Sequence, residues 1–132
     1  IMKGHTAIFT TAAGMLNELA ALDSEMALRR RIKFYAKPDV LVIDEVGYLS
    51  YSNRHADLLF EIINQRYEQK STMITTNKSF GEWSDIFPNA TVVVSIVDRL
   101  IHHSEIVNIK ADSYRLKEAE EQRKKREKPI KK

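Results

Sequence analysis

The apolar run Val40–Ile43 constrains the fold of this chain more than any other segment. Such a run predicts a strand that is buried on both faces, as in the parallel sheet of an α/β domain. Asp44 and Glu45 follow at once, where the strand must end. Because ligands bind at the carboxyl ends of the strands in an open α/β sheet, we expect both carboxylates to lie at a binding site.

An apolar strand that ends in Asp-Glu has the form of a Walker B motif. In that motif the first acid holds Mg²⁺ through water, and the second polarises the water that attacks a γ-phosphate. Asp44 is therefore a candidate magnesium ligand, and Glu45 is a candidate catalytic base. The alternative is the strand end of some other α/β protein, in which Asp44 only caps a turn.

The phosphate-binding loop of such a site does not occur in the sequence. The pattern Gly-x-x-x-x-Gly-Lys-Ser/Thr uses glycines so that backbone N–H groups can surround the phosphates. The chain has four glycines, and none of them belongs to this pattern. The loop normally precedes its Walker B strand, and Ile1–His5 has the form of a helix end, a Gly cap and a strand start. We therefore expect an N-terminally truncated piece of a longer protein, with an incomplete nucleotide site.

The composition is that of an ordinary globular protein. The chain has 132 residues, of which 43% are hydrophobic and 30% are charged, so it can form one domain with a core. It has no apolar run long enough to cross a bilayer, and its first residues do not resemble a signal peptide. It also has no cysteine, which excludes disulfides and thiolate metal sites. We expect a cytoplasmic protein with no membrane partner.

The positive charge is concentrated at the carboxyl end. Residues 123–132 contain seven Lys or Arg and one Glu, a net charge of +6, whereas the whole chain carries +3, so residues 1–122 carry −3. Basic runs bind nucleic acid because neutralised phosphates release counterions. A solvated, frayed terminus is an equally good interpretation. The candidate DNA contacts are Arg123, Lys124, Lys125 and Arg126.

Strands and helices are expected to alternate along the chain. The expected strands are Thr6–Thr10, Val40–Ile43, Ser71–Thr76 and Glu105–Lys110. The expected helices are Met15–Leu22, one capped by Asp23 or Ser24, one capped by Ser52 or Asn53, Phe80–Phe87, Ala90–His103 and Ser113–Glu127. The valines of Ala90–His103 also favour a strand, but the run is longer than most strands. The alternation predicts a parallel sheet in a three-layer α/β fold.

Three further polar residues suit a nucleotide site. Asn77 ends the strand after the Walker B strand, where its amide could hold the attacking water beside Glu45, although Asn is also a common turn residue. Arg99 has a rigid charged fork that suits a neighbouring subunit's phosphate site. Arg115 starts the last helix and could contact a phosphate. Taken alone, each arginine is more often an ordinary surface residue.

The order of these segments resembles the AAA+ ATPases of the IstB/DnaC type, and IstB-like transposition helper proteins in particular. The matching segments are Leu41–Leu49, Ile74–Asn77, Asp98–His103 and Ser113–Leu116. The resemblance runs from about His5 to Leu116. It implies a P-loop NTPase fold of the AAA+ type that is incomplete at the N-terminus. The partial core would be residues 1–116, from Walker B to sensor 2, and residues 117–132 would be a charged helical or disordered tail.

The resemblance also implies roles for the candidate residues. Asp44 would be the magnesium ligand, Glu45 the catalytic base and Asn77 the sensor 1 residue. Arg99 would be an arginine finger that acts on a neighbouring subunit, which requires a homo-oligomer, and Arg115 would be the sensor 2 arginine. The intact protein would use ATP and Mg²⁺. It would assemble on double-stranded DNA and assist a transposase subunit in target selection and strand transfer.

Two other functions fit the same sequence. One is a helicase loader of the AAA+ class, which has a similar core and a different partner. The other is a non-catalytic remnant that binds DNA through its tail. The segment Asp98–His103 favours the transposition protein. In every case we expect the isolated chain to lack ATPase activity, because it has no phosphate-binding loop lysine.

Overall fold

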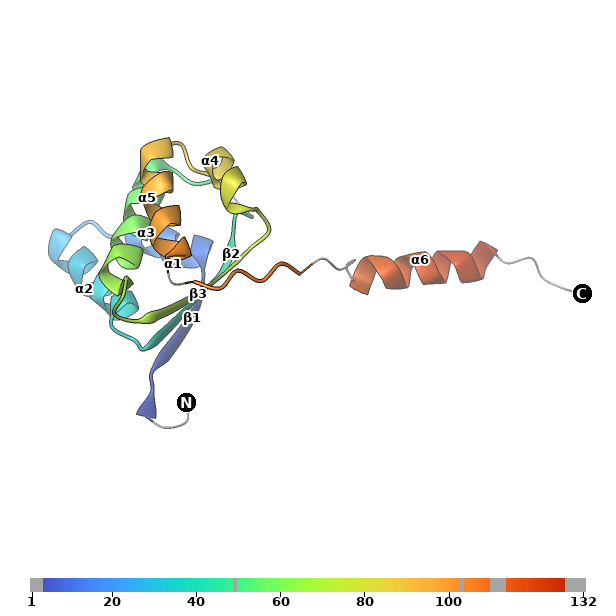
Figure 1. The fold of residues 1–132 in the computed structure, drawn as a ribbon, viewed down its shortest axis with the longest axis horizontal. Coiled ribbons are helices and arrows are strands. Elements are labelled where there is room, and N and C mark those ends of the chain that lie inside the picture. Colours follow the sequence, from blue (N-terminus) through green and yellow to red (C-terminus); the bar gives the residue numbers. More distant parts are fainter. Residues whose placement is uncertain (1–3, 49, 103, 110–113, 128–132) are drawn as a thin grey trace, which may run out of the picture.

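The computed structural model describes residues 4–48, 50–102, 104–109 and 114–127, and it leaves out the side chains of 114–119 and 127. The body contains one parallel sheet of three strands in the order β1-β2-β3 (Figure 1). The strands are β1 (Ala7–Thr11), β2 (Val40–Val46) and β3 (Ser71–Thr76). The predicted parallel α/β class is therefore confirmed.

Helices connect and follow the strands. They are α1 (Ala12–Ala20), α2 (Glu25–Ala36), α3 (Asn53–Arg66), the 3₁₀ helix η2 (Phe80–Glu82), α4 (Trp83–Ile86), α5 (Ala90–Ile101) and α6 (Tyr114–Glu127). Ser24 and Ser52 are the N-caps of α2 and α3, and each side chain accepts a hydrogen bond from a backbone N–H of the first turn. The prediction of a helix over Ala90–His103 is confirmed by α5. The Asn89 side chain caps the first turn of this helix.

One face of the sheet carries the core. Leu41 and Ile43 of β2 are fully buried, and α1 packs on β2 while α3 contacts α1, α2 and α5. On the opposite face Phe9, Val42 and Met73 pair across the strands, and Phe9 and Met73 are 67% and 58% exposed. Successive right-handed crossovers in the order β1-β2-β3 place their helices on the same face. The described residues thus fill two of the three layers that the sequence predicts.

The segment after α5 differs from the prediction. Residues 104–109 form no strand, and Ile106, Val107 and Ile109 are 57%, 77% and 86% exposed. The predicted strand Glu105–Lys110 is therefore wrong over its described part, because no neighbouring strand is present there to form a ladder with it. Beyond this segment, α6 extends away from the body (Figure 1).

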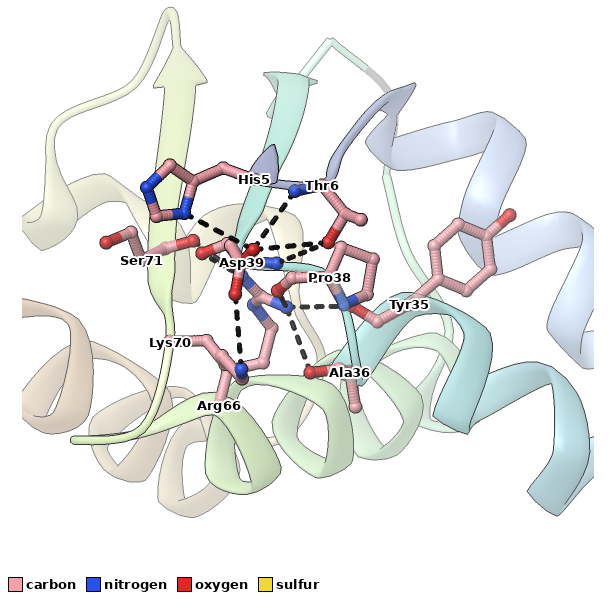
Figure 2. Close-up of polar contacts among 9 residues, drawn as sticks. All are labelled: His5, Thr6, Tyr35, Ala36, Pro38, Asp39, Arg66, Lys70 and Ser71. Atoms are coloured by element: carbon pink, nitrogen blue, oxygen red, sulfur yellow. Dashed lines mark hydrogen bonds and ion pairs between the residues drawn. The ribbon is translucent and has the colours of Figure 1, made fainter. Parts of the chain in front are cut away.

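A buried arginine joins the elements at the amino ends of the strands. Arg66, the last residue of α3, is 1% exposed. Its guanidinium donates to the carbonyl oxygens of Tyr35, Ala36, Pro38 and Ser71 (Figure 2). Beside it, the Asp39 carboxylate accepts hydrogen bonds from the Thr6 backbone N–H at 3.0 Å and from Lys70 Nζ at 3.3 Å. This junction fixes the end of the sheet that lies opposite Asp44 and Glu45.

Candidate functional site

The carboxyl end of β2 contains a β-bulge. The regular register between β2 and β3 is lost between the pairs Ile43–Ile74 and Val46–Thr76. Asp44 and Glu45 therefore stand opposite a single residue of β3, Thr75. Glu45 has a φ of +62°, a left-handed conformation that a non-glycine residue rarely adopts. Such backbone strain costs about 1–3 kcal/mol and tends to occur at functional sites.

The Thr75 hydroxyl contacts both residues of the bulge. It donates a hydrogen bond to Asp44 Oδ1 and accepts one from the Glu45 backbone N–H at 2.9 Å. Asp44 is half-buried, whereas Glu45 is exposed. The arrangement holds the Asp44 carboxylate in one orientation and turns the Glu45 side chain towards solvent, where it can meet a ligand.

Asn77 lies beside the turn that follows the two carboxylates. Gly47 has a φ of +102°, and a Cβ at this position would lie 2.8 Å from Asn77 Oδ1. The Gly47 N–H points to the Tyr51 hydroxyl at 3.4 Å, and the Tyr51 ring stacks on Phe87 with centroids 4.8 Å apart. Burial raises the pKa of the Tyr51 hydroxyl, the Gly47 N–H lowers it in part, and the charge of Glu45 adds a smaller rise. The structure thus brings Asn77 and both carboxylates to one end of the sheet.

The oxygen groups at this end suit a magnesium ion. Mg²⁺ prefers carboxylate and carbonyl oxygens, and it usually keeps several waters and binds one or two carboxylates together with substrate phosphates. In the part of the chain that the structure describes, no three His, Cys, Asp or Glu side chains gather around a common point that could hold a metal ion. The site therefore fits an ion bound through Asp44, water and phosphate, and it does not fit an ion enclosed by protein ligands alone.

Arg99 lies near the amino ends of the strands. Its Nε donates to Asn64 Oδ1 at 2.9 Å, and its guanidinium lies 5.0 Å from the centroid of the Phe60 ring. Asn64 belongs to the last turn of α3, a helix of 14 residues that is about 20 Å long. Because α3 starts after the carboxyl end of β2 and ends just before the amino end of β3 (Figure 1), the contact with Asn64 puts Arg99 at the opposite end of the sheet from Asp44. One copy of the chain does not bring them together.

The remaining candidate residues lie on α6. Arg115 is in the first turn of this helix, and its side chain falls outside the described residues. Its role as sensor 2 therefore stays a prediction. The exposed basic residues of the last turns of α6 are Arg123, Lys124, Lys125 and Arg126.

The contacts of Thr75 and the need for glycine at position 47 could not be predicted from the sequence. Thr75 is marked only by its place in the segment Ile74–Asn77, which carries the family resemblance. Its position opposite both carboxylates depends on the bulge, which no local pattern predicts. His102 Nδ1 forms a hydrogen bond with the Tyr67 hydroxyl.

Comparison with solved structures defines the class of fold. The structure of AMPPCP-bound DnaA from Aquifex aeolicus matches with a TM-score of 0.66 and 19% identity over 98% of this chain and 39% of that chain. A structure described as a DNA replication initiation factor matches with a TM-score of 0.64, again with 19% identity over 98% of this chain and 39% of that chain. At this identity the likeness concerns the fold alone. The fold is a partial P-loop NTPase fold of the AAA+ type.

Sequence comparison defines the family. Residues 1–122 match the family described as IstB-like ATP binding protein, and the chain belongs to this family. A putative ATP-binding protein of insertion sequence IS5376 from Geobacillus stearothermophilus is 42% identical over 118 residues, which are 89% of this chain and 47% of that protein. The IS21 putative ATP-binding protein from Pseudomonas aeruginosa is 38% identical over 115 residues, 87% of this chain and 43% of that protein. The chain therefore spans less than half the length of these relatives.

These matches confirm the resemblance to IstB-like proteins. Within the described residues, no helix is both long enough and apolar enough to span a membrane.

Proposed function

We propose that this chain supplies the Walker B and sensor 1 part of the site in an oligomeric ATPase that assists the transposition of an insertion sequence. The observation that carries the proposal is the position of Asp44, Glu45 and Asn77 at the carboxyl end of two neighbouring parallel strands, with a bulge at the two carboxylates. The names of the relatives support ATP as the nucleotide, since they describe putative ATP-binding proteins of insertion sequences.

Each residue of this group has a definite task in the proposal. Asp44, oriented by a hydrogen bond to one oxygen, presents its carboxylate to a hydrated Mg²⁺ ion. The bound ion supplies positive charge to the phosphates. Glu45 is exposed, so its carboxylate can accept a proton from the attacking water, and the Asn77 amide orients that water. The roles of these three residues are those that the family resemblance implies.

The position of Arg99 supports a site shared between subunits. An arginine finger must reach the γ-phosphate, and Arg99 lies at the opposite end of α3 from Asp44. It can serve only the site of a neighbouring copy. We therefore propose a homo-oligomer in which Arg99 completes the neighbour's site, and in which Arg115 acts as the sensor 2 residue. The core would comprise residues 1–116, and 117–132 would be the basic tail.

The test of ATP hydrolysis needs a phosphate-binding loop, which the sequence of these 132 residues does not contain. We would therefore replace the matching 118-residue segment of the Geobacillus stearothermophilus relative by this chain and measure ATP turnover of the chimera. We expect turnover that falls at least about 100-fold in Glu45→Gln, because the general base is removed, while ATP binding persists. Glu61→Gln, an exposed change on α3, is the matched control and should keep full activity.

Two results would contradict the proposal. One is a chimera whose turnover is the same with Glu45→Gln as without it. The other is a chimera whose turnover falls as much in Glu61→Gln as in Glu45→Gln. ATP turnover by the isolated 132-residue chain that survives purification and is abolished by Glu45→Gln would instead contradict the expectation that this chain alone lacks ATPase activity.

We further propose double-stranded DNA and a transposase subunit as partners, with roles in target selection and strand transfer. The family and the basic end of α6 support this assignment. A pull-down with the chimera as bait distinguishes it from a helicase loader, because transposase should be retained and replicative helicase should not. Retention of helicase alone would contradict the assignment.

A further inference from the structure

We propose that Thr75 is a positioning residue, whose hydroxyl sets the geometry of both acidic residues of the site. The inference rests on the proposed function, because it concerns the same magnesium and water-activating groups. Thr75 lies on β3, 31 residues from Asp44 in the sequence, and the family resemblance, which includes the segment Ile74–Asn77, assigns it no role.

The bulge makes Thr75 the single partner of two residues. In a regular parallel ladder each residue of β2 would face one residue of β3, but here Asp44 and Glu45 share Thr75. The extra residue of a bulge has no ladder partner, so the Glu45 N–H needs another acceptor. The Thr75 hydroxyl oxygen provides it at 2.9 Å. This contact holds Glu45 in its left-handed conformation, with a φ of +62°.

The same hydroxyl has only one proton to donate, and it donates it to Asp44 Oδ1. This contact fixes the rotation of the carboxylate and leaves Oδ2 for a metal ion or its water shell. Partners of this kind orient metal-binding side chains, and their removal commonly lowers metal affinity about 10- to 100-fold. A hydroxyl can accept and donate at once, whereas the isosteric valine side chain can do neither. The role therefore requires threonine or serine.

The neighbouring Thr76 provides a matched comparison. It lies on the same strand, and its hydroxyl donates to the Val46 carbonyl oxygen at 2.6 Å and accepts from the Lys78 N–H at 3.1 Å. These contacts hold backbone groups and do not reach the carboxylate of Asp44. A Thr-to-Val change at either position removes the hydrogen bonds of one hydroxyl on β3, but only the change at Thr75 removes a contact to an acidic side chain.

The experiment measures metal binding by the 132-residue chain itself. Manganese(II) alone, the paramagnetic substitute for magnesium, is titrated into isotope-labelled protein, and the broadening of the amide signals of Asp44, Glu45 and Asn77 gives a midpoint concentration. We expect Thr75→Val to raise this midpoint about tenfold. Thr75→Ser should keep it within about twofold of the wild-type value, since serine retains the hydroxyl. Thr76→Val should leave it unchanged, and Asp44→Asn should abolish the localised broadening.

The outcomes separate the inference from the proposed function. A localised broadening that disappears in Asp44→Asn but is unchanged in Thr75→Val would overturn the role of Thr75 and leave the metal site in place. Equal shifts in Thr75→Val and Thr76→Val would also overturn it, because they would show a general loss of strand structure. A tenfold rise of the manganese midpoint in Thr75→Ser would also overturn the role of Thr75, even if Thr75→Val did not fold. Broadening that Asp44→Asn does not alter would overturn the proposed metal site itself, and the inference with it.

Discussion

Gly47 sets the position that Asn77 can occupy. Its φ of +102° is unfavourable for any residue with a side chain, and a Cβ there would meet Asn77 Oδ1 at 2.8 Å. We expect Gly47→Ala to lower the free energy of unfolding by about 1–3 kcal/mol and to shift the side-chain amide signals of Asn77. Urea unfolding and amide NMR measure the two effects. Gly81→Ala is the matched control, because a Cβ at Gly81 would lie 4.0 Å from its nearest neighbour. An unchanged Asn77 in Gly47→Ala would contradict this account of the turn.

The acidic residues of the site could be predicted from the sequence because their signal is local. Asp44 and Glu45 follow an apolar run directly, and the end of a buried strand is a position with functional meaning. Thr75 could not be predicted, because its contacts depend on the register between two strands and on a bulge in one of them. Register is a property of the folded sheet, and it is not encoded in either strand alone.

The junction around Arg66 connects α2, α3 and the amino ends of two strands. Replacement of Arg66 by Met keeps an apolar stem but leaves several buried carbonyl groups without a donor. We expect Arg66→Met to lower the free energy of unfolding by about 3 kcal/mol, measured by urea denaturation. Arg54→Met, at an exposed position in the first turn of the same helix, should change it by less than about 0.5 kcal/mol. Equal small effects of both changes would contradict a structural role for the buried guanidinium.

Asp39 makes the same junction sensitive to acid. The hydrogen bond from the Thr6 backbone N–H, followed by that from Lys70, lowers the pKa of the Asp39 carboxyl. The folded state therefore binds this proton less readily than the unfolded state, so the carboxylate stabilises the fold at neutral pH. This stabilisation should be lost as the pH falls below about 4, through the lowered pKa of the folded state. Urea unfolding between pH 7 and pH 3 gives the free energies of unfolding of wild type and Asp39→Asn, and the difference between them should narrow towards low pH. A difference that stays constant over this range would contradict the role of the Asp39 carboxylate.

Whether a helix or strand could be predicted from the sequence depends on whether local residues or distant partners stabilise it. The helix α5 was predictable because the apolar run is too long for an ordinary strand, and the structure adds Asn89 as its N-cap. The segment Glu105–Lys110 has the composition of a strand, but a strand needs a partner for its backbone groups, and the described residues offer none. The layer on the side of Phe9 and Met73 depends in the same way on elements beyond the described sheet.

The basic tail acts at the scale of the whole molecule, because it reverses the sign of the net charge. Removal of residues 123–132 takes away +6 and leaves a chain of −3. We expect this truncation to weaken duplex DNA binding and to flatten the dependence of log K on log salt by about 0.9 for each phosphate that the tail would otherwise neutralise. Fluorescence anisotropy at several salt concentrations measures the slope.

A variant of the same length but lower charge tests whether charge or length matters in the tail. Replacement of Arg123, Lys124, Lys125 and Arg126 by Gln keeps the length of the chain and should give most of the effect of the truncation. Identical slopes for wild type, truncation and Gln variant would show that the tail does not contact DNA.

The central claim is that two copies of the protein share each nucleotide site, because Asp44 and Arg99 lie at opposite ends of one copy. In the chimera with the Geobacillus stearothermophilus relative, Glu45→Gln and Arg99→Ala should each abolish ATP turnover, since an arginine finger alone contributes about 10³–10⁵ in rate. A mixture of the two variants, however, contains interfaces with an intact Glu45 from one copy and an intact Arg99 from the other.

The most direct test is the ATP turnover of that equimolar mixture. Random assembly in a head-to-tail oligomer predicts about a quarter of the wild-type rate, because one in about four interfaces combines both intact residues. A mixture of Arg99→Ala with the double variant Glu45→Gln/Arg99→Ala is the control and should stay inactive. If the equimolar mixture of the two single variants is as inactive as each variant alone, the site is not shared between copies and the account is contradicted.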